Sequence, residues 1–195
     1  MRSSPICTLG TPHRDLIIGH LLALDSDARV LRFGCRVSDD RVRQYVGELD
    51  FGRDAIFGVA DRPRSLGALV HLAFPPSTDT PGGVVEFGVS VLLALRGQGL
   101  GSRLFEHAVV HARNRGMKRM VIHMARDNAA MRAIVRSAGA AMAFDGPDVI
   151  AELPLPADTL GSQMQEWFGH QTVLLRGPAN GWPAFERPAF GHSVR

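Results

Sequence analysis

The amino-acid sequence predicts an α/β (α+β) fold in which a mixed central sheet is flanked by helices. Residues 54–61 (DAIFGVAD) and 66–74 (LGALVHLAF) are strand-like, and the turn-like residues 62–65 between them predict a hairpin. Residues 84–95 (VVEFGVSVLLAL) are apolar on both faces, which is typical of a central strand covered on two sides. A glycine-rich loop and a helical pattern follow this strand directly.

The segment before the hairpin predicts one short strand and two helices. The strand is expected near Ile6 to Leu9, and a helix from about Pro12 to Leu24 follows, because its apolar residues recur at helical spacing. Ser38 is a suitable first cap for the second helix, SDDRVRQYVGEL. Asp39 and Asp40 then fall in its first turn, where the helix dipole favours acidic side chains.

The segment after the hairpin predicts a loop, two helices and two more strands. Residues 75–83 are rich in proline and form the loop. A helix from Leu100 to Arg115 presents Leu104, Phe105 and Ala108 inward and Arg103, His107, Arg113 and Arg115 outward, and Gly116 ends it. Residues 119–125 (RMVIHMA) form a strand, a helix runs from Asp127 or Asn128 to near Gly139, and residues 148–155 (DVIAELPL) can close the sheet.

Length and composition predict one domain with a C-terminal extension. The 195 residues suit a single domain over residues 1–157, followed by an extension over 158–195. The extension begins with a short helix near 158–168 and continues as a tail rich in glycine, proline and aromatic residues. Such a tail has no fixed fold of its own, or it contacts a second copy in a homodimer through its aromatic side chains Trp167, Trp182, Phe185 and Phe190.

Several classes of protein are excluded by composition. No segment approaches the ~20 apolar residues that span a bilayer, and the first residues lack a secretory apolar core, so we expect a cytoplasmic protein with no membrane contact. Cys7 and Cys35 are far apart and have no histidine cluster, which argues against a zinc site, any other metal site and a disulfide framework. The net charge of +3 comes almost wholly from arginine, which suits phosphate or carboxylate recognition, but no motif for specific nucleic-acid binding accompanies it.

The loop RGQGLGS, residues 96–102, is the strongest functional signal. A loop with almost no side chains before a helix can hold an anion on its backbone N–H groups. A Walker loop would need lysine and a hydroxyl residue after the last glycine, where Ser102 and Arg103 stand. A dinucleotide fingerprint would need glycine at Ser102 and an acidic residue ending the next strand. A tight turn without ligand stays open as the alternative.

The remaining pattern, R-x-x-G-x-G at Arg96, Gly99 and Gly101, resembles the pyrophosphate-binding motif of the GNAT superfamily of acyl-CoA-dependent N-acyltransferases. The resemblance includes an N-x-x-M…G pattern at Asn128, Met131 and Gly139, and it covers about residues 29–155. Glu86-Phe87 and residues 31–46 are similar to the acyltransferase domains of bacterial protein-lysine acetyltransferases. The resemblance implies a splayed pair of central strands, acetyl-CoA or another short-chain acyl-CoA as co-substrate, and a primary amine as acceptor. A protein lysine is the favoured acceptor, a small-molecule amine is an alternative, and a binding or sensing module with weak turnover is a second hypothesis.

The resemblance also assigns the cofactor-binding residues. The backbone amides that would hold the pyrophosphate belong to Gly97, Gln98, Gly99, Leu100, Gly101 and Ser102, and Arg96 or Arg103 could add charge. The pantetheine arm is expected to pair like an extra strand with the backbone near Val91 and Leu93, and Asn128 to contact it. Gly88 within the strand permits a bulge or a close backbone approach, either of which would suit a splayed strand.

Glu86 is the candidate catalytic residue. A carboxylate among apolar neighbours is disposed to accept a proton from the attacking amine, although Glu86 could instead be structural and a water chain could be the base. Many family members carry a tyrosine in the last helix as general acid, and Val135 stands at that position here. Tyr45 is the only tyrosine and lies in the N-terminal helical region. Of the histidines, His71 and His123 on strands favour a satisfied or surface role, and His107 and His111 a solvated one.

Overall fold

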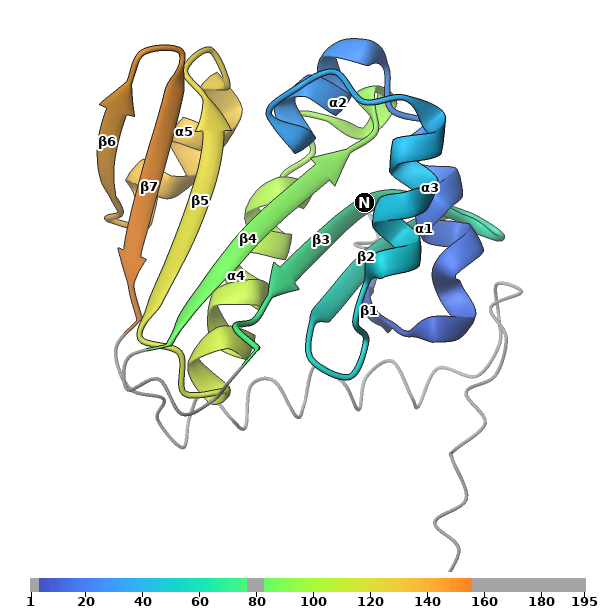
Figure 1. Ribbon diagram of the computed structural model, residues 1–195, viewed down its shortest axis with the longest axis horizontal. Coiled ribbons are helices and arrows are strands. Elements are labelled where there is room, and N and C mark those ends of the chain that lie inside the picture. Colours follow the sequence, from blue (N-terminus) through green and yellow to red (C-terminus); the bar gives the residue numbers. More distant parts are fainter. Residues whose placement is uncertain (1–3, 77–82, 156–195) are drawn as a thin grey trace, which may run out of the picture.

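The computed structural model describes residues 4–76 and 83–155, and within them a seven-stranded mixed sheet forms the centre of the molecule (Figure 1). The strand order is β1-β2-β3-β4-β5-β7-β6. The strands are β1 (Ile6–Leu9), β2 (Ala55–Arg62), β3 (Ser65–Ala73), β4 (Val84–Val91), β5 (Arg119–Ala125), β6 (Ala141–Asp145) and β7 (Asp148–Pro154). The predicted α/β fold with a mixed sheet is confirmed, because β4 and β5 are parallel and every other neighbouring pair is antiparallel.

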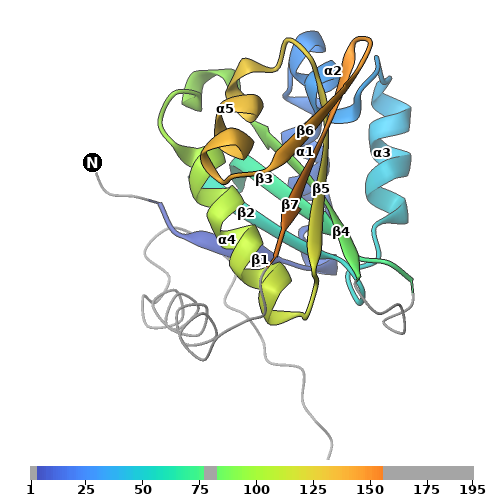
Figure 2. The same cartoon turned by 90° about the vertical axis from the view of Figure 1, so that its left-hand side faces the viewer.

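Helices cover the sheet on both faces (Figure 2). The α-helices are α1 (Arg14–Leu22), α2 (Ser26–Phe33), α3 (Asp39–Glu48), α4 (Leu100–Asn114) and α5 (Ala129–Ser137), and two short 3-10 helices are η1 (Thr11–His13) and η2 (Leu93–Leu95). One core cluster joins α4 and α5 to the side chains of Phe57, Val70 and Phe87. A second cluster, on the opposite face, joins α1 and α3 to Ile56 and Leu69. The strand side chains alternate between these two cores, as the period of a β-strand requires.

Most predicted elements are present within one to three residues of their expected bounds. The β2–β3 hairpin closes with Arg62 opposite Ser65, and Arg64 adopts a φ of 61° in its turn. Ser38 caps α3 by accepting a hydrogen bond from the amide of Arg41, and Gly116 follows α4 with a φ of 73°. The predicted strand over 84–95 is too long, because β4 ends at Val91 and residues 93–95 turn into η2.

Two elements differ from the sequence prediction. Helix α2 was not expected; the Asp25 side chain caps it by accepting from the amide of Ala28, and Gly34 ends it at a φ of 73°. The helix is only eight residues long and Ala28 is its only buried residue, so it contributes little to the apolar core. Residues 148–155 do form a strand, but β7 lies inside the sheet and the unpredicted β6 forms the edge. Since β6 is almost entirely exposed, it lacks the alternation that marks a half-buried strand.

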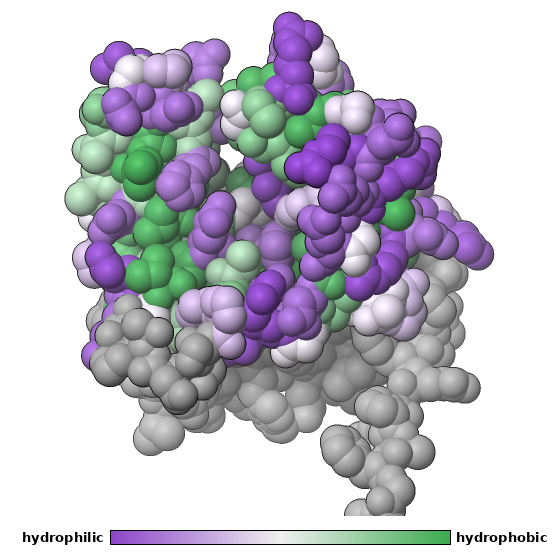
Figure 3. Space-filling model, in the orientation of Figure 1, coloured by the Kyte–Doolittle hydropathy of each residue, from purple (hydrophilic) through white to green (hydrophobic). Residues whose placement is uncertain are grey.

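Strands β4 and β5 separate along their length, and this separation positions the candidate site. Their pairing is limited to Val84 with Arg119, Val85 with Met120 and Glu86 with Val121. Beyond Glu86 the two strands diverge toward α2, as Figure 1 shows, and the surface is hollowed between them (Figure 3). The splayed central strand pair is thereby confirmed. Helix α2 lies against both strands near the wide end of the gap.

Within the described residues, no helix has the length and apolar character needed to cross a membrane. The predicted helix near 158–168 and the aromatic tail lie outside the described residues, as does most of the loop predicted over 75–83.

Candidate active site

Glycine is required in the loop before α4 for two different structural reasons. Gly97 and Gly99 adopt φ values of 73° and 75°, in the left-handed region that favours glycine. Gly101 has ordinary backbone angles, but a Cβ there would lie 3.3 Å from Cδ1 of Ile134. Gly101 therefore lets the first turn of α4 pack closely against α5.

The amides of this loop are free to receive a ligand. The first helical hydrogen bond of α4 runs from the amide of Arg103 to the carbonyl of Gly99, at 3.1 Å. The six amides from Gly97 to Ser102 have no acceptor among residues 4–76 and 83–155. Gly99, the N-cap residue, offers no side chain to cap them, and the first turn of α4 carries no acidic residue. Six unpaired donors at the positive end of a 15-residue helix are suited to hold an anion.

The arginines beside the loop are tied to backbone carbonyls. Arg96 donates from Nε to the carbonyl of Val91 at 3.3 Å, and Arg103 donates from Nη2 to the carbonyl of Ser4 at 2.9 Å. Neither carbonyl neutralises the charge, so both guanidinium groups still add positive potential around the six amides. Gln98 is exposed, and its side-chain amide donates to the carbonyl of Ala94 at 3.4 Å.

The edge of β4 that faces the gap carries unpaired backbone groups. Leu92 donates its amide to the carbonyl of Gly67, on the β3 side, at 2.9 Å. Because successive backbone groups of a strand point to opposite edges, the amides of Val91 and Val89 point toward β5. Neither has a partner on β5, since the pairing stops at Glu86. Leu93 belongs to η2 and exposes 67% of its surface beside this edge.

Gly88 permits a close approach and not a bulge. The register between β3 and β4 runs without interruption from Ala73–Glu86 to Ala68–Val91. The group that approaches Gly88 is the guanidinium of Arg32, and a Cβ at position 88 would lie 2.8 Å from its Cζ. Of the two alternatives that the sequence left open, the bulge is therefore absent, and the missing side chain makes room for a cation from α2.

Glu86 lies on the same strand face as Gly88, opposite the face that packs on α4. Its neighbours Val85 and Phe87 are buried in the α4 core, whereas the Glu86 side chain is exposed. The apolar enclosure that the sequence led us to expect is thus not present. An exposed carboxylate at the start of the gap can contact a substrate and exchange protons with water.

A partly buried hydrogen-bonded chain lies beside Glu86 and Gly88. The Tyr45 hydroxyl accepts from Nη2 of Arg32 at 2.7 Å and lies 2.7 Å from Nδ1 of His71. Nε2 of His71 lies 3.1 Å from the Asp54 carboxylate. The sequence singled out Tyr45 and His71 separately, but it did not point to Asp54 or Arg32, which come from different segments.

The charges in this chain have clear physical causes. Burial and the nearby Arg32 charge lower the pKa of His71, despite the opposing influence of Asp54 and Glu86, so His71 is neutral at pH 7. Burial raises the pKa of Asp54, but hydrogen bonds from Arg53, His71 and the amide of Phe74 outweigh it and leave the pKa lowered. In this chain an anionic Asp54 is hydrogen-bonded to a neutral His71, and His71 in turn is hydrogen-bonded to the Tyr45 hydroxyl.

The other residues that the sequence singled out are Asn128, Val135 and three histidines, and most of them have structural roles. Asn128 caps α5, because its Oδ1 accepts from the amide of Met131 at 3.1 Å, and this leaves its side-chain nitrogen available. Val135 is fully buried and supplies no hydroxyl group. His107 and His111 are not solvated as expected; their rings pack edge-on against Phe57, with centroids 4.5 and 5.0 Å away. His123 is exposed, in agreement with a surface role.

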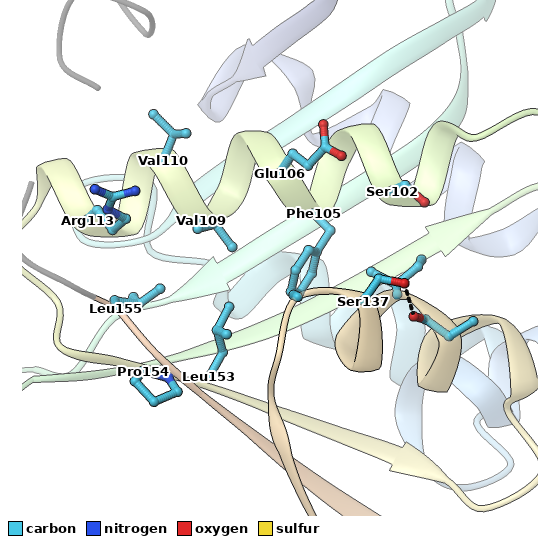
Figure 4. A pocket seen from close by; sticks show the side chains of 13 residues that line it. Ser102, Phe105, Glu106, Val109, Val110, Arg113, Ser137, Leu153, Pro154 and Leu155 are labelled. Atoms are coloured by element: carbon cyan, nitrogen blue, oxygen red, sulfur yellow. Dashed lines mark hydrogen bonds between the residues drawn. The ribbon is translucent and has the colours of Figure 1, made fainter. Parts of the chain in front are cut away.

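A pocket of about 560 Å³ lies on the other face of the sheet, between α4 and α5 (Figure 4). It is mostly apolar, with Phe105 and Val109 of α4 facing Leu153 and Leu155 at the end of β7. Only Ser102 is shared with the loop, so the sequence motif did not reveal it. In the part of the chain that the structure describes, no group of three or more histidine, cysteine or acidic side chains is placed to hold a metal ion.

Comparison with solved structures shows the same fold in several acetyltransferases. The chain is similar to the GNAT domain of PAT from S. lividans, with 21% identity, a TM-score of 0.65, and coverage of 77% of this chain and 89% of that one. It is also similar to an N-acetyltransferase from Staphylococcus aureus Mu50, with 18% identity, a TM-score of 0.59, and coverage of 80% and 100%. A third structure is yncA from Salmonella typhimurium, named a putative acetyltransferase and solved with its cofactor acetyl-CoA, with 17% identity, a TM-score of 0.60, and coverage of 81% and 97%.

Comparison with sequences gives the family directly. No curated protein matches the chain. The model of the acetyltransferase (GNAT) family matches residues 25–140, which include α2, the diverging strands, the glycine loop and α5. This match spans more than half of the chain, and the protein therefore belongs to the acetyltransferase (GNAT) family.

Proposed function

We propose that the protein transfers an acetyl group from acetyl-CoA, or another short-chain acyl group from its CoA thioester, to a primary amine by direct attack. One observation carries the proposal: six unpaired amides, residues 97–102, lie next to the unpaired edge of β4. Acetyl transfer from acetyl-CoA is general in this family. The amides and the strand edge match the two polar parts of that co-substrate, its diphosphate and its amide-containing arm.

Binding of the donor is divided between the loop and the strand. The amides from Gly97 to Ser102 hold the diphosphate, with added charge from Arg96 and Arg103. The arm then enters the gap and pairs with the amides of Val89 and Val91 in place of a strand. Leu93 and the free side-chain nitrogen of Asn128 flank this path. Beyond Glu86, no strand of the described chain fills the gap between β4 and β5, so the gap can accept the arm.

The chemical step needs placement and a neutral amine more than covalent help. The amine nitrogen attacks the thioester carbonyl carbon, an N–C bond forms, the C–S bond breaks, and coenzyme A leaves as the thiolate. A free β4 amide donates to the carbonyl oxygen as negative charge develops there. An ordinary amine with a pKa of about 10 is mostly protonated at pH 7, so its proton must be removed, and Glu86 accepts it directly or through water.

The leaving group does not require a general acid. Thiols ionise near pH ~8.5, so a thiolate is a good leaving group at neutral pH. Val135 offers no proton, and the Tyr45 hydroxyl is already shared between Arg32 and His71. The thiolate takes its proton from solvent after it leaves.

Among acceptors, a protein lysine is our first candidate, because of the resemblance to bacterial protein-lysine acetyltransferases. A small-molecule amine is the second candidate. The alternative of a binding module with weak turnover rests on the missing hydroxyl at Val135. A cytoplasmic location, the absence of specific nucleic-acid binding and a homodimer remain predictions.

Two measurements test the proposal. Acetyl-CoA should raise the melting temperature of the protein, and free thiol should be released when lysine peptides or amines from a panel are added. Stabilisation by acetyl-CoA without thiol release from any amine would favour the binding module, and no stabilisation would refute the site itself. Glu86→Gln should lower kcat most near neutral pH, where the amine is mostly protonated, and the difference should narrow at high pH, where the amine is already neutral, with acetyl-CoA affinity unchanged; an unchanged rate at every pH would remove Glu86 from its role.

A further inference from the structure

We propose that Arg32 binds a carboxylate group of the acceptor, so that the preferred acceptor is a primary amine that carries a carboxylate close by. This inference rests on the proposed function and names the class of its second substrate. It comes from the position and unpaired charge of Arg32, which the acetyl-CoA site does not use.

The position of Arg32 is set by α2 and by Gly88. Helix α2 lies against β4 and β5 near the wide end of their gap. A Cβ at position 88 would lie 2.8 Å from Cζ, 2.8 Å from Nη1 and 3.0 Å from Nη2 of Arg32. Because these three distances are nearly equal, the guanidinium plane lies flat over the backbone of Gly88. Only glycine leaves room for a cation at this point of the strand.

The charge of Arg32 has no counterion within the described segments. Its one hydrogen bond goes from Nη2 to the Tyr45 hydroxyl, and its other contacts are the faces of the Phe33 and Tyr45 rings, at 5.1 and 5.5 Å. Its Nε is sealed from solvent and has no acceptor among those residues, and Nη1 has none either. Of the five N–H donors of a guanidinium, the two on Nη1 and the second one on Nη2 are therefore left for a ligand.

A neighbouring arginine on the same helix shows the contrast. Arg29 donates to the carbonyls of Leu24 and Leu22 and forms an ion pair with Asp39 at 2.6 Å. Arg29 is thus a structural arginine whose donors are used within the fold. Arg32, one helical turn later, is also held in a defined position, but it forms no ion pair with an acidic side chain among the described residues.

Three residues hold the Arg32 guanidinium in place. Since Arg32 donates to the Tyr45 oxygen, the Tyr45 hydroxyl proton turns to Nδ1 of His71, and Nε2–H of His71 donates to Asp54. The amide of Phe74 donates to the same Asp54 carboxylate at 3.2 Å. A chain anchored in this way orients the fork for a planar anion, and a carboxylate accepts two parallel N–H bonds from such a fork.

The spacing of Glu86 and Gly88 along β4 suits a small bifunctional acceptor. The Cα atoms of residues 86 and 88, two positions apart on one strand face, are about 6.6 Å apart. Glu86 at the start of the gap contacts the amine, and Arg32 above Gly88 contacts the carboxylate. The required carboxylate could belong to an amino acid or to an acidic residue beside a lysine in a peptide, and both sources offer the same chemistry.

The test is a binding measurement on the protein saturated with coenzyme A, so that it does not depend on turnover. In one arm, the Kd of each common amino acid is compared with the Kd of its primary carboxamide. In the other arm, the Kd of lysine peptides with a neighbouring Asp is compared with the Kd of the same peptides with Asn. We expect at least tenfold tighter binding of the acid than of the amide in one of the two arms, as befits a charge-assisted hydrogen bond. The arm that responds identifies the source of the carboxylate.

Variants separate the role of Arg32 from general effects of charge. Arg32→Gln should abolish the preference for the acid, whereas Arg36→Gln, the same change at an exposed position nearby, should retain it. Tyr45→Phe keeps Arg32 but removes its anchor, and should reduce the preference about threefold to tenfold. Acetyl-CoA binding measures whether each variant is folded. Equal binding of acids and amides by the unmodified protein would overturn the inference, and so would an equal loss of affinity for both in Arg32→Gln. Failure of the unmodified protein to bind acetyl-CoA would instead refute the proposed function.

Discussion

His20 is a buried histidine that the fold keeps neutral. It exposes 2% of its surface and joins α1 to the sheet, since its Nδ1 lies 2.9 Å from the Leu66 carbonyl and its Nε2 lies 2.8 Å from the Ser90 hydroxyl. Burial lowers the pKa of His20 from 6.5 to about 4, although the bond to Leu66 opposes this, and the charge of Arg32 lowers it further. Protonated His20 would therefore be far less stable in this position than in water.

The size and sign of the effect on stability follow from this shift. Above pH 6.5 His20 is neutral in both the folded and the unfolded chain. As the pH falls below 6.5, the unfolded chain binds a proton that the folded chain rejects until about pH 4, so the free energy of unfolding decreases. The difference between a pKa of 6.5 in the unfolded chain and one of about 4 in the folded chain corresponds to about 3 kcal/mol in total, of which about 2 kcal/mol is lost by pH ~5.

The assay is reversible urea unfolding of the protein and of His20→Gln at pH 8, 7, 6 and 5. The variant should be less stable at pH 8, because it loses packing and hydrogen bonds. Between pH 8 and pH 5, however, it should lose about 2 kcal/mol less stability than the unmodified protein, because it has no histidine to protonate on unfolding.

His123→Gln is the matched control, since His123 is exposed and its replacement should leave the pH dependence unchanged. If His20→Gln and the unmodified protein lose the same stability between pH 8 and pH 5, the reasoning about His20 is wrong.

Three further changes test the loop, the cap of α5 and the core. Gly99→Ala forces alanine to a φ of 75°, which costs about 1 kcal/mol, and should raise the Kd of acetyl-CoA about tenfold in a calorimetric titration. Gly116→Ala places the same strain at the other end of α4, so it should reduce stability and leave this Kd unchanged; equal effects on Kd would contradict the proposed loop site. Asn128→Ala removes the cap on the amide of Met131 and should destabilise the fold by about 1 kcal/mol in chemical denaturation, whereas Asn128→Asp should retain most of the stability. Leu104→Ala leaves a cavity at a fully buried position between α4 and the sheet and should cost about 2–5 kcal/mol of unfolding free energy; a cost below about 1 kcal/mol would mean that this core is loosely packed.

The elements that the sequence predicted well are those encoded by neighbouring residues. The periodicity of residues 100–115 identified α4, the apolar runs identified β2, β3 and β5, and Ser38 and Gly116 marked helix ends correctly. The glycine loop belongs to this group as well. Its conformation depends on the φ angles of Gly97 and Gly99 and on the start of α4, all of which lie within a few residues of one another.

Other features were decided only when distant segments came together. Helix α2 and strand β6 are short and bury few residues, so their positions depend on the elements beside them. The exposure of Glu86 and the packing of His107 and His111 on Phe57 depend on which neighbours the fold supplies. The chain of Arg32, Tyr45, His71 and Asp54 joins α2, α3, β3 and the residue before β2, a combination that no local pattern encodes. Local backbone preference thus determined the conformation of the glycine loop, whereas long-range packing determined which charged side chains lie together beside the gap between β4 and β5.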